Sequence, residues 1–188
     1  MDRLPKAQSV DKQGQPDGFT PPAAFVPQVL EGGYTRLLVS CPPKALPALH
    51  QDLVAAMAGP LKVLYIQLTD RQQGQLPKPV QRVGVELEPA TVLAALGELE
   101  DLICWDGRHQ LWVRGALGEQ VVLEELGIIY AYPDDPAFRD VCARHGLRED
   151  ATAQTMVERD YVKVNFLAEA DRQEARLVWT LGLQEWVG

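Results

Sequence analysis

Four carboxylates flank one short apolar run of the sequence and could together bind a metal ion. Glu124 and Glu125 precede the run 128–132, and Asp134 and Asp135 follow it. Carboxylate oxygens gathered at one rim would bind Mg²⁺ or Ca²⁺. A strand rises about 3.3 Å per residue, so the two pairs are expected at opposite ends of one strand. This spacing favours surface roles, and a metal-dependent hydrolase built from scattered carboxylates is kept only as an alternative.

Cysteine and histidine suggest a second chemistry, a thiol activated by a neighbouring base. Cys142 and His145 lie three residues apart in a predicted helix, close enough to touch. His50 falls on the apolar face of another predicted helix, whereas His109 follows a turn and is expected to be exposed. Cysteine packs as a small buried hydrophobe more often than it reacts. Packing is therefore the expected role of Cys142.

Residues 158–163 combine two carboxylates with a lysine, a set that can hold Mg²⁺ and steady an attacking water. Alternation places Glu158 and Asp160 on one face of a strand and Lys163 on the other. The stretch is therefore interpreted as the polar face of an amphipathic strand. No metal ligand is predicted here.

Aromatic residues lie in the same part of the chain as the acids. Trp112, Tyr130 and Tyr132 occupy predicted strands, and alternation places the two tyrosines on one face. Cross-strand aromatic pairs stabilise sheets, while exposed ones become anchors at protein interfaces. The predicted partner-binding surface has seven members: Glu124, Glu125, Tyr130, Tyr132, Asp134, Asp135 and Trp112.

Charge is distributed unevenly along the 188 residues, whose net charge is −8. Residues 85–135 hold two basic residues against eleven acidic ones, a net charge of −9. Such a block repels phosphates, so direct nucleic-acid binding is not expected. It would instead attract a basic protein.

Motifs for the commonest enzyme classes are missing from the sequence. There is no GxxxxGK[ST], GxGxxG, HExxH or GxSxG. No cofactor and no catalytic residue are predicted, and the balance leans away from an enzyme. The three cysteines are widely spaced, which indicates reduced thiols in a cytoplasmic setting. No apolar run is long enough for a membrane span, and the first residues do not resemble a secretory signal.

Residues 1–33 are rich in proline and glycine and show no regular period, which indicates an irregular arm. Phe25, Val26 and Leu30 make part of it apolar enough to dock on another surface. Residues 34–188 are predicted to form a single domain. The sequence does not define its oligomeric state.

The body alternates between the periods of strands and helices. Expected strands are 35–39, 63–66 (covered on both faces), 83–87, 103–105, 111–113, 121–123, 128–132 and 156–166. Expected helices are 46–58, 88–102, 134–146 and 168–181, and 72–77 is expected to be an exposed loop. Connections within 103–132 are too short for parallel crossovers. The predicted fold is α+β: a mixed or antiparallel sheet with a central meander, about four helices and the irregular arm.

Three functions fit these features. The leading hypothesis is a non-catalytic protein-binding module, inhibitor-like or immunity-like, whose acidic sheet face engages a basic partner. The second is an adaptor or subunit held in a larger assembly through residues 1–33. The third is the metal-dependent hydrolase.

Overall fold

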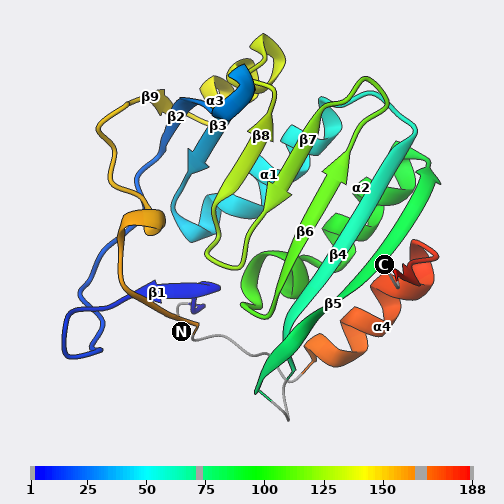
Figure 1. Ribbon diagram of the computed structural model, residues 1–188, viewed down its shortest axis with the longest axis horizontal. Coiled ribbons are helices and arrows are strands. Elements are labelled where there is room, and N and C mark those ends of the chain that lie inside the picture. The colour runs from blue at the N-terminus through cyan, green and yellow to red at the C-terminus, as the bar shows by residue number, and fades with distance from the viewer. Residues whose placement is uncertain (1–2, 71–73, 164–168, 187–188) are drawn as a thin grey trace.

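The computed structural model describes residues 3–70, 74–163 and 169–186. These residues form one large, open, mixed sheet with helices packed on it (Figure 1). The predicted α+β class is confirmed. No helix within the described ranges is both long and apolar enough to cross a bilayer.

The described residues form four α-helices and eleven strands. The helices are α1 (Leu46–Ala55), α2 (Pro89–Glu98), α3 (Pro136–Arg144) and α4 (Ala170–Thr180). The strands are β1 (Ala7–Ser9), β2 (Ala24–Val29), β3 (Thr35–Ser40), β4 (Leu61–Asp70), β5 (Gly74–Leu87), β6 (His109–Arg114), β7 (Gln120–Leu123), β8 (Ile129–Tyr132), β9 (Arg148–Glu149), β10 (Tyr161–Lys163) and β11 (Gln184–Glu185). Short 3₁₀ turns cover Glu31–Gly33, Pro43–Ala45 and Met156–Glu158, and a π-helical turn covers Asp101–Trp105.

Nine of the described strands form the main sheet, in the order β11-β5-β4-β6-β7-β8-β3-β2-β9. Its neighbours are antiparallel except for β2 and β9. The predicted meander is present as β6, β7 and β8, which are consecutive in the chain and adjacent in the sheet. Strands β1 and β10 pair separately.

The main core lies between this sheet and the helices, and α1 and α2 lie behind the sheet in Figure 1. Alternation along β4 sends Val63 and Tyr65 into that core, whereas Leu64 faces the opposite side and is only half-buried. The strand predicted at 63–66 is therefore not fully covered on both faces. Helix α3 begins as predicted: the Asp135 carboxylate accepts a hydrogen bond from Ala137 N at 2.8 Å, and Pro136 occupies the first turn.

The N-terminal segment differs from the irregular arm that its composition indicates. Ala24–Val29 form β2, which pairs with β3 along its whole length. The carbonyl groups of Ala23 and Phe25 accept bonds from the β9 side, so alternation turns the nitrogen of Pro27 toward the outer edge. A proline is tolerated where no ladder donor is needed. Proline therefore did not prevent strand formation here.

Three other elements differ from the sequence-based expectation. Residues 103–105, expected as a strand, belong to the π-helical turn, in which four apolar side chains are buried together. Periodicity does not distinguish a short buried helix from a strand. Residues 74–77, expected in a loop, extend β5. The strand expected at 156–166 is limited to β10 after a 3₁₀ turn, and its last residues lie outside the described ranges.

Candidate functional site

The face of the main sheet opposite the helices carries a continuous row of mostly apolar side chains. Antiparallel register aligns one residue from each of seven strands: Val83, Leu64, Trp112, Val122, Tyr130, Leu38 and Val26. Alternation places the two predicted tyrosines on this face, while Ile129 and Ala131 join the main core. The row has two halves that differ in what lies over them.

The covered half lies over β7, β8, β3 and β2. Ala7 from β1, Phe19 from the following loop and Met156 pack against Leu38 and Tyr130 in a second apolar cluster. An ion pair between the Arg159 guanidinium and Asp17 joins the two segments of this cover. Segments from both ends of the chain thus hold this half of the face.

Tyr130 and Tyr132, the predicted interface aromatics, are engaged within the chain. The guanidinium carbon of Arg36 lies 4.0 Å from the centroid of the Tyr130 ring, and Arg36 Nη1 donates to the Tyr132 hydroxyl at 2.8 Å. Tyr130 is only 8% exposed. The pairing of β3 with β8 therefore places Arg36 against both tyrosines, which lie near acidic residues in the sequence.

Glu124 and Glu125 lie in the β7–β8 turn and are both half-buried. Burial, reinforced by the neighbouring Glu125, raises the pKa of Glu124. Glu125 accepts a hydrogen bond from Gln110 Nε2 at 2.7 Å, and the Lys163 ammonium lies 3.9 Å away. Glu125 therefore has partners within the chain.

Asp134 and Asp135 lie at the other end of β8, as the strand length predicted. Asp134 forms a two-pronged ion pair with Arg139, at 2.6 and 2.7 Å, and Asp135 caps α3. The pKa of Arg139 is raised by its hydrogen bonds to Asp134 and Glu149. Both carboxylates thus have local structural partners.

The residues predicted to dock the arm lie within the main sheet or just after β2. Phe25 is buried in the main core, and Val26 packs against the second cluster. Leu30 follows β2, and its backbone N–H donates to the Tyr34 carbonyl at 2.7 Å. The segment therefore docks on the body of its own chain.

The open half of the face lies over β6, β4, β5 and β11, and it is hollowed into a groove of about 400 Å³. We call this hollow the groove. Its side-chain lining includes Lys62, Leu64, Val83, Val85, Trp112, Arg114, Gln120 and Trp186. Val85 is 54% exposed and Trp186 is 58% exposed. Of these residues, only Trp112 belonged to the predicted surface.

A β-bulge shapes the groove. Leu61 and Val63 on β4 pair with Leu87 and Gly84 on β5, so β5 contains one extra residue there. Glu86 takes a left-handed conformation with φ 54°, which non-glycine residues rarely adopt. The bulge lets Gly84 and Leu87 both face the helices while Val83 and Val85 line the groove. Simple alternation along the strand would place Leu87 on the same face as the two valines, so the sequence pattern does not reveal this surface.

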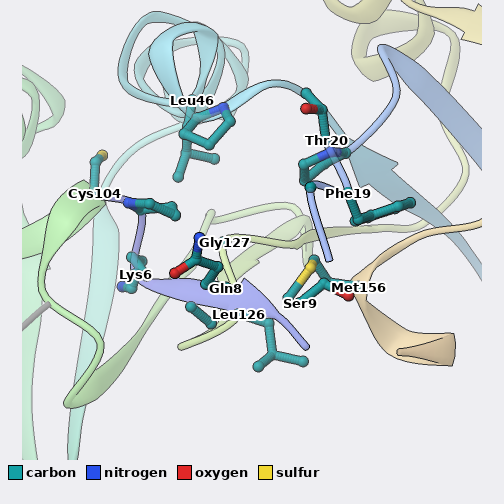
Figure 2. Close-up of a pocket in the computed structure, with 15 residues that line it drawn as sticks. Lys6, Gln8, Ser9, Phe19, Thr20, Leu46, Cys104, Leu126, Gly127 and Met156 are labelled. Carbon is teal, nitrogen blue, oxygen red and sulfur yellow. The ribbon is translucent and has the colours of Figure 1, made fainter. Parts of the chain in front are cut away.

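A separate cavity of about 300 Å³ lies between the N-terminal cover and the body (Figure 2). Its lining includes Lys6 just before β1, Leu46 at the start of α1 and Cys104 in the π-helical turn. Lys6 is fully buried, and its ammonium donates to the Ile103 carbonyl at 2.8 Å. Burial lowers its pKa to about 8. This hydrogen bond anchors the residue before β1 to the π-helical turn.

The thiols and imidazoles around this region are not arranged as activated nucleophiles. Burial raises the pKa of Cys104 to about 12, which keeps the thiol protonated at neutral pH. His50 and His109 are both buried, and burial lowers the pKa of each. The expectation that His109 is exposed was wrong, because the residue opens β6 and its ring stacks on Tyr65 with centroids 5.0 Å apart.

The other side chains considered for catalysis or metal binding are likewise not assembled into a site. His145 Nε2 contacts Asp52 at 2.7 Å, and burial raises the pKa of Cys142 to about 11. Glu158 belongs to a capping box with Thr155. Within the described ranges, no group of three or more His, Cys, Asp or Glu side chains is placed to hold a metal ion.

Comparison with known proteins finds no matching family model, no significantly similar curated protein and no significantly similar solved structure. A function therefore has to be inferred from the surface itself.

Proposed function

We propose that this protein is a non-catalytic protein-binding module whose binding surface is the groove. The observation that carries the proposal is the exposure of Val85 and Trp186 beside the half-buried Trp112, on a sheet face whose other half is covered. Exposed apolar side chains gathered in one hollow, with polar groups at its rim, are typical of interaction sites. Tryptophan is also enriched among the residues that dominate binding energy.

The shape and chemistry of the groove favour a protein segment over a reacting substrate. It is open rather than enclosed, and its lining offers apolar surface, two cations and an amide, with no cysteine, histidine or carboxylate. The polar atom of Trp112 is already used, since its Nε1 donates to Gln110 Oε1 at 3.1 Å. The ring is thereby held in place and offers a fixed apolar surface.

Affinity capture with matched variants tests this proposal. The groove variant carries Val85→Ser and Trp186→Ser, and the control carries Val29→Ser and Tyr34→Ser. The control residues are apolar side chains near the opposite edge of the sheet, and they are more exposed than the groove pair. A partner should be retained by the intact chain and by the control, and its affinity for the groove variant should fall at least about tenfold. Equal retention by all three proteins would contradict the proposal.

A basic partner at the acidic residues remains a second candidate function. The net charge of −8 supports it through long-range attraction, even though several of the named carboxylates have partners within the chain. Capture that weakens steeply with salt and is lost in Glu124→Gln/Glu125→Gln would favour this candidate. Retention of that partner by the groove variant would show that the partner binds outside the groove.

A further inference from the structure

The charge at the groove is opposite in sign to that of the chain. Lys62 on β4 and Arg114 on β6 both line it, and both are exposed. The chain as a whole has a net charge of −8, and the block 85–135 has a net charge of −9. Two cations therefore lie at the groove of a protein whose net charge is negative.

Arg114 is distinctive within its block. It is one of two basic residues there, and the other, Arg108, is buried in an ion pair with Asp106 at 2.9 Å. Arg114 is thus the exposed base of a segment with eleven acids. Its side chain points to the groove face because it alternates with Val113, which is buried in the main core.

The register places Lys62 and Arg114 directly opposite each other on adjacent strands. Like charges in this position destabilise a sheet. Within the described ranges, no ion pair joins either of them to a carboxylate. Glu86 lines an adjoining hollow together with both cations, whereas the groove itself has no carboxylate in its lining.

Resting on the proposed function, we infer that the groove binds a short acidic peptide segment of a partner protein, with apolar side chains between its carboxylates. The carboxylates pair with Lys62 and Arg114, and the apolar side chains pack on Val83, Val85, Trp112 and Trp186. A volume of about 400 Å³ holds a few side chains of such a segment. Charge complementarity then relieves the cross-strand repulsion that the free protein retains.

Panning a random peptide library displayed on phage against the full chain tests the inference. The same library is panned against Lys62→Glu/Arg114→Glu and against a matched control, Lys12→Glu/Arg144→Glu. The control makes the same change in net charge at exposed bases outside the groove. Far-ultraviolet circular dichroism of all three proteins verifies that they are folded.

The expected peptides contain Asp or Glu interspersed with Phe, Leu or Trp. Their affinity should fall about tenfold or more for Lys62→Glu/Arg114→Glu, and less than about threefold for the control. Enrichment of basic or uncharged peptides that still require Val85 and Trp186 would overturn the inference and leave the proposed function standing. Enrichment of no peptide above background would overturn both. Self-association of the full chain that is lost in Val85→Ser/Trp186→Ser would also overturn the inference, because a second copy would then be the occupant.

Discussion

The two halves of one sheet face are built alike but are used differently. In the covered half, Tyr130 and Leu38 lie beneath Ala7, Phe19 and Met156 and contribute to folding. In the open half, side chains of similar type form a groove in which Trp186 is 58% exposed. The same alternation produces both halves, so strand pattern alone does not define an interaction surface. The difference depends on which half the terminal segments fold over.

The largest expected difference between the halves is in stability. Tyr130→Ala removes a buried ring and the stacking of Arg36, and should lower the free energy of unfolding by about 4 kcal/mol. Trp186→Ala removes a ring that is mostly in solvent and should cost less than about 1 kcal/mol. Urea denaturation of the two variants measures both values. Equal losses would remove the distinction between a folding half and a binding half.

The anchor of the cover gives a prediction about pH. Because burial lowers the pKa of Lys6 from 10.5 to about 8, the folded state binds fewer protons than the unfolded state between these values. Stability contributed by this group therefore rises with pH from about 8 to about 10.5, by up to about 3 kcal/mol.

The control for this prediction is Lys6→Met, which removes the titrating group and keeps the apolar stem. Chemical denaturation of both proteins across that range gives their difference, in which the cysteines and tyrosines cancel. Parallel pH dependence in the two proteins would show that Lys6 is not held as a buried amine.

The smallest effect concerns the acidic residues that the sequence pointed to. Asp135→Ala removes the cap of α3 and should lower the free energy of unfolding by about 1 kcal/mol. Capture of the groove partner should not change. Reduced capture by a variant that retains its stability would instead place Asp135 in the interface, as the sequence-based hypothesis holds.

Local signals explain which elements the sequence could predict. Helix α3 was predicted from Asp135 and Pro136, and the meander from its short apolar runs and glycine turns, because these signals act within a few residues. The burial of His109 and the position of Arg36 over Tyr130 depend on strand pairs that are distant in sequence. A single sequence does not reveal such pairing.

The groove escaped prediction for two physical reasons. The bulge at Glu86 changes which residues of β5 share a face, so the alternation of Val83, Val85 and Leu87 indicated the wrong grouping. The pairing of Lys62 with Arg114 also joins a residue of the acidic block 85–135 to one outside it. The net charge of the whole protein is negative, so it does not indicate a local surface of opposite sign.

Indole resonances test the central claim most directly, because the chain has four tryptophans that sample different places. Trp112 and Trp186 line the groove, Trp105 is buried in the core, and Trp179 is 87% exposed on α4. The chain, with its indole nitrogens labelled with ¹⁵N, would be titrated with the captured partner or an enriched peptide and followed by NMR. Selective shifts of Trp112 and Trp186 are expected, with Trp105 and Trp179 unchanged. Saturable shifts of Trp179 or Trp105 with the groove pair unmoved would contradict the assignment of the open half as the binding surface.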